Sequence, residues 1–272
     1  MKTKTQIFYL EKAFIIFLLF IFFIYNLYKI NYGLPYFTNI DEIRYQYGAL
    51  SYLSFLSGYY GFAEPVIGPL ISLILILKFI FINEILINFQ SIDEIANKIY
   101  FNPEIFILYG RIASLTTATI SIFFLFLIFK KLKINFLVYS FLLLTFASSL
   151  PVYNVASYFG KHSHFLLVFL IQLYFLFKYL VKIDRFNFKS YIIFAFLGSM
   201  AWGILYWPAF ISIYAVLILH FKRFNFSKIH YLLIFFAIFV LCGPTFGMLI
   251  YNVPILEFLA TGEQLKNLEI IS

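Results

Sequence analysis

The run Ala13–Ile30, with the sequence AFIIFLLFIFFIYNLYKI, decides the class of fold. It follows the lysine-bearing stretch Met1–Lys12 and approaches the ~20 apolar residues that cross a ~30 Å hydrocarbon core. It is long for a secretory signal peptide, and the following Asn31-Tyr32-Gly33-Leu34-Pro35 is a poor processing site. We therefore expect an uncleaved signal anchor with residues 1–12 in the cytoplasm.

The composition of the whole chain extends this interpretation. Of its 272 residues, 63% are hydrophobic and 12% are charged, and the mean hydropathy is +0.94. These values lie outside the range of soluble globular proteins. Its one cysteine, Cys242, excludes an intramolecular disulfide. Further apolar runs cover roughly residues 105–129, 134–150, 164–181, 190–205, 208–221 and 229–250, so we expect an all-α polytopic membrane protein with about seven transmembrane helices.

The links between these runs set the expected topology. Lys130–Lys133, Lys182–Lys189 and Lys222–Lys228 are all basic, and the positive-inside rule places them in the cytoplasm with the N-terminus. The formal net charge of +8 then divides into +11 inside and −3 outside.

Pro65–Ile82 is an apolar run that this topology does not allow to cross the membrane. A single crossing would move every later basic link to the outside, so we expect an interfacial or shallow re-entrant helix. Residues 31–104 then form a first outer loop with interfacial helices, and a loop of this length is usually functional. Residues 105–250 form the helix bundle and 251–272 an outer tail, all within one transmembrane domain, 1–272.

Asp41 and Glu42 open the expected outer loop and are its leading candidates for chemistry. A carboxylate pair just outside the membrane, in so apolar a chain, is a functional hypothesis by default. The apolar spacing across Asn39–Leu56 predicts a loop helix that Asn39 caps, with Glu42 as the acidic half of a capping box. Both carboxylates could simply complement the helix dipole, or Glu42 could cap while Asp41 faces a cavity.

The other candidates on the expected outer face each have a structural alternative. Glu64 precedes a proline and could be a helix-start carboxylate, whereas Arg111 could anchor at the headgroups or reach a lipid phosphate. The basic cluster at Lys161, His162 and His164, in an expected short loop, could anchor at the interface or pair with a lipid phosphate. The two histidines could also ligate a divalent metal ion, although no carboxylates lie nearby in the sequence. The expected spans carry few ionisable residues, which argues against an ion pathway through the bundle.

The order of these features resembles the C-type (GT-C) membrane glycosyltransferases, in particular the protein O-mannosyltransferases and lipid A aminoarabinose transferases. Asp41-Glu42-Ile43-Arg44-Tyr45 is similar to their Asp-Glu opening, and Ala63-Glu64-Pro65 through Pro69 to the proline-containing stretch before their second loop helix. Arg111-Ile112-Ala113-Ser114-Leu115 is similar to the Arg-x-x-Ser start of their second span.

This resemblance implies transfer of a sugar from a polyprenyl-phosphate carrier to a lipid, glycan or protein acceptor on the outer face. Asp41 would be the general base, and membrane lipids would be further partners, with no nucleic acid involved. Two membranes remain possible, a bacterial inner membrane of the cell envelope and an endoplasmic reticulum membrane, and the compact loops favour the bacterial one. The substrate-binding candidates are Glu42, Arg44, Glu64, Arg111, Lys161, His162 and His164.

Two departures from the family leave alternatives open. Lys161-His162-Ser163-His164 stands where many relatives carry a second acidic residue, and the chain stops at Ser272, so we expect an N-terminal half. The alternatives are a non-catalytic lipid-binding or assembly protein on the same scaffold, and a flippase or transporter for lipid-linked sugars.

Overall fold

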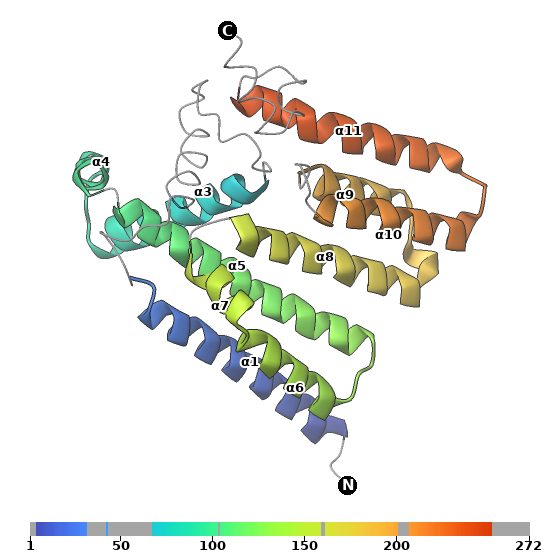
Figure 1. Cartoon of the computed structure of the whole chain (residues 1–272), viewed down its shortest axis with the longest axis horizontal. Helices are drawn as coiled ribbons and strands as arrows, with labels where there is room; N and C mark the ends of the chain where they lie inside the picture. The colour runs from blue at the N-terminus through green and yellow to red at the C-terminus, as the bar shows by residue number, and fades with distance from the viewer. Residues whose placement is uncertain are drawn as a thin grey trace.

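The protein is all-helical wherever its structure is described. The computed structural model describes residues 4–31, 42, 67–102, 104–158, 161–200 and 207–251 (Figure 1). In these ranges ten α-helices are joined by one π-helix and one 3-10 turn, which confirms the all-α prediction. In chain order the elements are α1 (Lys4–Tyr28), α3 (Ile67–Ile80), the π-helix η1 (Phe81–Ile87), α4 (Ile92–Phe101), α5 (Glu104–Lys131), α6 (Phe136–Ala147), α7 (Leu150–Ser157), α8 (Lys161–Val181), the 3-10 turn η2 (Ile183–Arg185), α9 (Phe188–Met200), α10 (Trp207–Phe224) and α11 (Ile229–Tyr251).

Three of these helices are long and apolar enough to cross a membrane. They are Phe8–Tyr28 of α1, the whole of α5, and His162–Val181 of α8. The pair α6 and α7 passes the same test as a unit, although it bends by 55° at its break, and would be the fourth. Three to four candidate spans indicate a multi-pass integral membrane protein.

The prediction of about seven transmembrane helices is wrong for the described chain. α9 has 13 residues and is therefore about 20 Å long, which is short of a ~30 Å hydrocarbon core. α6 has only 12 residues, because the chain breaks after it and Pro151 stands in the first turn of the next helix, α7. Hydropathy locates the apolar runs but does not show where one straight helix ends and the next begins.

α5 is the central helix, and it packs against α1, α3, α7 and α8. Gly110, Ser114 and Ala118 are buried along it, and small residues at this spacing let neighbouring helices approach closely. The buried hydroxyls of Thr117 and Ser121 donate to backbone carbonyls of the preceding turn, at 2.8 Å for Ser121. Both hydroxyl groups therefore have a hydrogen-bond acceptor within α5 itself.

The apolar side chains form two main cores on either side of α8, which lies between α5 and α10 (Figure 1). The core between α1, α5 and α6 includes Phe22, Leu115, Ile122, Tyr139 and Leu143. The core between η2, α9, α10 and α11 includes Phe186, Phe194, Val216, Leu219 and Phe235. A smaller cluster packs α3 onto the first turns of α5, through Leu73, Ile76, Phe106, Ile107 and Ala113.

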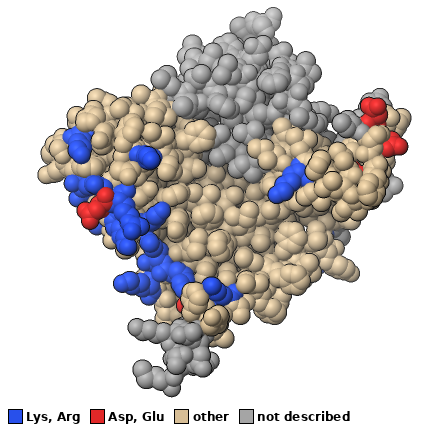
Figure 2. Space-filling view, turned by 180° about the vertical axis from the view of Figure 1, so that it is seen from behind, with Lys and Arg blue, Asp and Glu red and all other residues tan. Residues whose placement is uncertain are grey.

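The basic links lie together at one end of the bundle. The chain turns at that end between α5 and α6, between α8 and α9, and between α10 and α11 (Figure 1). Figure 2 shows most of the visible Lys and Arg side chains gathered along this edge, with acidic side chains both among them and at the opposite edge. Glu11 of α1 pairs with Lys130 of α5 at the basic end, and Asp93 and Glu94 begin α4 at the opposite end. The two ends therefore differ in charge as the sequence predicts.

Arg223 of α10 holds the link between α8 and α9 at the basic end. Its Nη1 donates to the backbone carbonyl of Ile183 at 3.0 Å and also to those of Asp184 and Phe186. These carbonyls belong to the 3-10 turn and its end, where the helical hydrogen-bond pattern stops. The guanidinium thus lies against three backbone carbonyls and ties α10 to the turn.

The close approach of α9, α10 and α11 at Gly198 gives a test of this packing. A Cβ at Gly198 would lie 2.5 Å from the ring Cε2 of Phe239 and 2.7 Å from the Cβ of Ser212, which is fixed to the backbone. We expect Gly198→Ala to lower the free energy of unfolding by about 1–3 kcal/mol through overpacking, although Ala favours helix more than Gly does. Denaturant unfolding in detergent micelles measures this. Lys189→Ala, at an exposed position of α9, is the control, and equal stability of the two variants would contradict the close packing.

Candidate functional site

Arg111 lies in the second turn of α5 and forms the most completely buried charged contact in the described residues. Its Nε donates to Oε1 of Glu42 at 2.7 Å, and its Nη2 donates to Oε2 at 2.8 Å. The side chains of Arg111 and Glu42 are 2% and 1% exposed. The remaining nitrogen, Nη1, donates to the carbonyl of Ile30 at 2.9 Å. One guanidinium therefore joins α5, the end of α1 and residue 42.

The geometry explains why an arginine fits this position. A buried charge is costly unless it is paired and its hydrogen-bonding groups are satisfied, and the planar guanidinium can meet a carboxylate with two parallel bonds. The ring of Tyr158 adds a cation–π contact, with its centroid 6.0 Å from Cζ of Arg111. Lysine would offer one ammonium to these partners and could not reproduce the two-pronged contact.

These contacts differ from the expected roles of both residues. Arg111 is buried, so its guanidinium does not lie exposed at the headgroups as an interfacial anchor. The carboxylate of Glu42 binds Arg111, in addition to any capping of its own helix. Asp41 is covalently joined to Glu42 but lies outside the described residues, as do Arg44, Glu64 and all of the predicted Asn39–Leu56 helix except Glu42.

The expected polar loop at residues 151–164 is largely helical. α7 covers Leu150–Ser157, and α8 begins at Lys161, whose side chain lies outside the described part. His162 is exposed, whereas His164 is fully buried and its Nδ1 lies 3.2 Å from Oγ of Ser163. Residues two apart on a helix point about 200° away from each other, so His162 and His164 do not face a common ion. Within the described ranges, no group of three His, Cys, Asp or Glu side chains could hold a metal ion.

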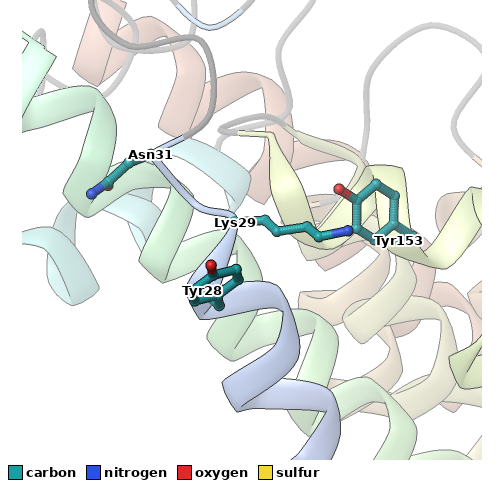
Figure 3. Close-up of a pocket in the computed structure, with 4 residues that line it drawn as sticks. All are labelled: Tyr28, Lys29, Asn31 and Tyr153. Atoms are coloured by element: carbon teal, nitrogen blue, oxygen red, sulfur yellow. The ribbon is translucent and has the colours of Figure 1, made fainter.

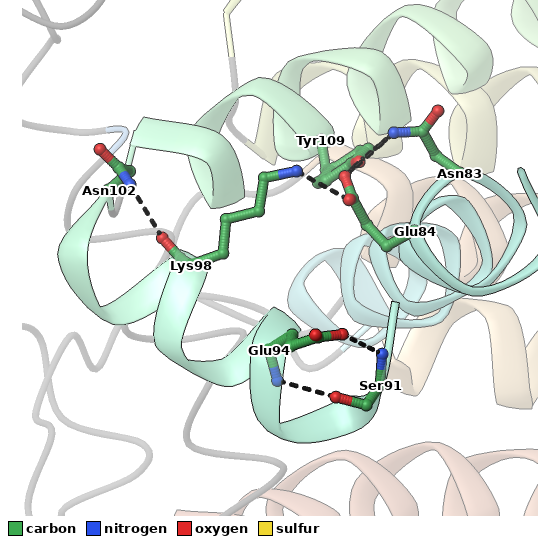
Figure 4. A network of polar contacts seen from close by, with 7 residues as sticks. All are labelled: Asn83, Glu84, Ser91, Glu94, Lys98, Asn102 and Tyr109. Carbon is green, nitrogen blue, oxygen red and sulfur yellow. Dashed lines mark hydrogen bonds and ion pairs between the residues drawn. The ribbon is translucent and has the colours of Figure 1, made fainter. Parts of the chain in front are cut away.

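Glu84 is a second buried carboxylate, and it is not among the candidates named from the sequence. It lies in η1 and accepts hydrogen bonds from Lys98 of α4 at 2.8 Å and from Asn83 at 3.0 Å (Figure 4). The hydroxyl of Tyr109 in α5 also donates to it, and Asn83 donates to that hydroxyl at 2.9 Å. Its position inside the apolar stretch 79–87 was the available signal, since a charge among apolar residues needs a partner.

The local structure around Glu84 fixes Lys98 in place. Ser91 caps α4 by accepting from the backbone N–H of Glu94 at 3.3 Å, and Glu94 accepts from the N–H of Ser91 at 2.7 Å (Figure 4). This capping box sets the start of α4, and Lys98 follows about one turn after Glu94. The ammonium of Lys98 thereby reaches back to η1.

The charge on Glu84 is stabilised by its partners. Burial raises its pKa, but hydrogen bonds from Lys98, Tyr109 and Asn83 outweigh that effect and hold the pKa at about 2, below the ordinary 4.5. Glu84 is therefore ionised at neutral pH and is unsuited to act as a general base. Its network serves to fasten η1 and α4 to α5.

No family model, curated protein or solved structure matches the chain.

The buried Arg111–Glu42 pair predicts a large penalty for removing one partner. We expect Glu42→Gln to lower the free energy of unfolding by about 3–5 kcal/mol, because it leaves the Arg111 charge buried without a counter-charge. Denaturant unfolding in micelles measures this. The matched control is Glu11→Gln, because its partner Lys130 is 38% exposed and such pairs contribute about 0–1 kcal/mol. The double variant Glu42→Gln/Arg111→Met should lose less unfolding free energy than the two single variants lose in sum. Strict additivity of the two losses would contradict a direct interaction between Glu42 and Arg111.

The Glu84 network predicts a stability that falls at acid pH. Because the folded pKa of Glu84 is about 2 and its ordinary value is 4.5, its contribution is complete above pH 4.5 and is lost as the pH falls toward 2. The shift corresponds to about 3 kcal/mol. The difference in unfolding free energy between wild type and Glu84→Gln should therefore shrink between pH 6 and pH 3. Lys98→Met removes one cause of the low pKa and should move this loss to higher pH, and a constant difference across the range would refute the assignment.

Proposed function

We propose that this chain is part of a membrane glycosyltransferase that moves a sugar from a polyprenyl-phosphate carrier to an acceptor at the outer membrane face, with Asp41 as the base. The observation that best supports it is the buried contact of Arg111 with the carboxylate of Glu42 and the carbonyl of Ile30. A buried ion pair adds little net stability compared with apolar residues of the same size. We infer that this pair serves to hold the residue next to Asp41 against the start of α5. Consecutive Cα atoms are about 3.8 Å apart, so Asp41 stays close to that point.

The proposed topology places Asp41 where such a carrier is accessible. If the basic end of the bundle lies in the cytoplasm, the start of α5 and Glu42 lie at the outer side of the membrane, in a bacterial inner membrane. A carrier embedded in the bilayer presents its phosphate at that level, so the sugar need not be supplied by a soluble nucleotide.

The proposed reaction requires one base and one leaving group. The Asp41 carboxylate takes the proton of the acceptor hydroxyl, and the hydroxyl oxygen attacks the anomeric carbon of the sugar. The bond from that carbon to the phosphate oxygen breaks, and its electron pair leaves with the polyprenyl phosphate. Attack opposite the leaving group inverts the anomeric centre. Because Arg111 neutralises Glu42, the neighbouring residue adds no unpaired negative charge beside the base.

A flippase is less well supported by the described helices. A pathway for a polar head group needs polar or charged residues through the middle of the spans. Within the described part of α5, the hydroxyls of the buried Thr117 and Ser121 donate to carbonyls of their own helix. An assay of sugar transfer distinguishes the transferase from the alternative of a non-catalytic lipid-binding protein.

We expect Asp41→Asn to lower sugar transfer by about 10²–10⁴-fold, the usual contribution of a positioned base. The assay follows labelled sugar from polyprenyl-phosphate donors in membranes that contain the protein made from its natural reading frame. Asp93→Asn, at an exposed first-turn position of α4, is the matched control and should transfer normally.

Undiminished transfer by Asp41→Asn would exclude Asp41 as the base. Absence of transfer by the wild type across a panel of donors would instead favour the non-catalytic alternative.

A further inference from the structure

A pocket of about 650 Å³ lies at the end of α1, away from the basic end of the bundle. Tyr28, Lys29 and Asn31 line it from α1 and the turn that follows, and Tyr153 lines it from α7 (Figure 3). Figure 3 shows the Lys29 side chain extended toward Tyr153. A volume of this size is in the usual range for small-molecule sites, ~300–1,000 Å³.

The pocket contains a cation and several hydroxyl groups. The ammonium of Lys29 donates to the hydroxyl of Tyr25 at 3.0 Å and lies 4.8 Å from the centroid of that ring. The hydrogen bond to Tyr25 and the nearby phenols of Tyr153 and Tyr28 raise the pKa of Lys29, so it stays charged at neutral pH. In the part of the chain that the structure describes, no carboxylate pairs with this ammonium.

An exposed apolar stripe on α1 leads to the pocket. Its residues recur at alternating four- and three-residue spacing, so they share one helix face. They are Phe17, Ile21, Ile24 and Tyr28, with exposed fractions of 64%, 47%, 47% and 88%. Because this face belongs to a candidate span, it can lie against an acyl or prenyl chain up to the level of Lys29.

We propose that this pocket binds the phosphate group of a membrane lipid, with Lys29 as the cation, Tyr153 as a hydroxyl donor, and the lipid chain along the α1 stripe. A positive charge and phenolic donors suit phosphate oxygens, which accept charge-assisted hydrogen bonds. A bilayer lipid would bring its phosphate to this level with its chain in the hydrocarbon core. The simpler role of Lys29 and its tyrosines is interfacial anchoring, which requires no bound lipid.

The pocket adjoins the Arg111 site through one peptide segment. Ile30, whose carbonyl accepts from Arg111, lies between the pocket residues Lys29 and Asn31. A lipid phosphate at Lys29 would therefore sit beside the chain that holds Glu42. The inference deepens the proposed function and rests on it only for the view that the lipid is a sugar carrier, because phosphate binding itself requires no transfer.

The test measures lipid binding to the purified full chain in neutral-lipid nanodiscs by native mass spectrometry. The probes are undecaprenyl phosphate, the uncharged undecaprenol, phosphatidylglycerol and inorganic phosphate. We expect the phosphate-bearing lipids to bind and undecaprenol to bind at least tenfold more weakly. Lys29→Met should weaken binding about tenfold and Tyr153→Phe by a smaller factor, since bonds to charged groups are the stronger ones. Lys78→Met, which alters an exposed lysine of α3 outside the pocket, is the matched control.

The outcomes separate the sources of the phosphate. Preference for undecaprenyl phosphate supports a carrier site, and equal binding of phosphatidylglycerol supports a general phospholipid site. Full competition by inorganic phosphate, equal binding of undecaprenol, or identical effects of Lys29→Met and Lys78→Met would overturn the proposal. Variants are compared only at unchanged melting temperature, and Tyr153→Phe serves as the second variant if Lys29→Met misfolds. Asp41→Asn should retain lipid binding, so a failure of the proposed transfer is distinguishable from a failure of this site.

Discussion

The guanidinium of Arg111 is the contact on which the candidate site depends. It satisfies Glu42 with two hydrogen bonds and the carbonyl of Ile30 with a third, all in a buried environment. No apolar residue could serve the three acceptors at once, and an unsatisfied carboxylate there would be strongly destabilising. The contact therefore constrains the end of α1, the segment at residue 42 and the start of α5 together. A substrate site in the predicted outer loop would therefore lie next to these three segments.

The first turns of α5 hold that loop at two places. Arg111 binds Glu42, and Tyr109 binds Glu84, whose network also includes Lys98 of α4. Tyr109 and Arg111 are two residues apart, so they project from nearly opposite sides of the helix. Glu42 and Glu84 are therefore held on different sides of α5.

The sequence predicted the helical class and the charge difference between the two ends, because both depend on local composition. It did not predict helix lengths, since the break between α6 and α7 near Pro151 depends on packing as much as on hydropathy. It singled out Glu42 and Arg111 separately, but not their pairing across 69 positions. It did not single out Glu84, because the partners that bury and satisfy this carboxylate, Lys98 of α4 and Tyr109 of α5, come together only in the folded chain. The alternative in which His162 and His164 bind a metal ion assumed a loop, whereas a helix directs the two rings apart.

The position of Ile30 links the two proposed activities physically. Its carbonyl is fixed by Arg111, and its two neighbours, Lys29 and Asn31, line the pocket. A ligand that orders the pocket would therefore favour the same arrangement that Arg111 imposes on Glu42, and the two effects must be reciprocal because both are binding equilibria on one chain. If a lipid carrier occupies the pocket, its phosphate and the segment holding Asp41 are positioned by the same guanidinium. A single buried arginine would then align donor and base, which is a physical reason for this chain to retain a costly buried charge.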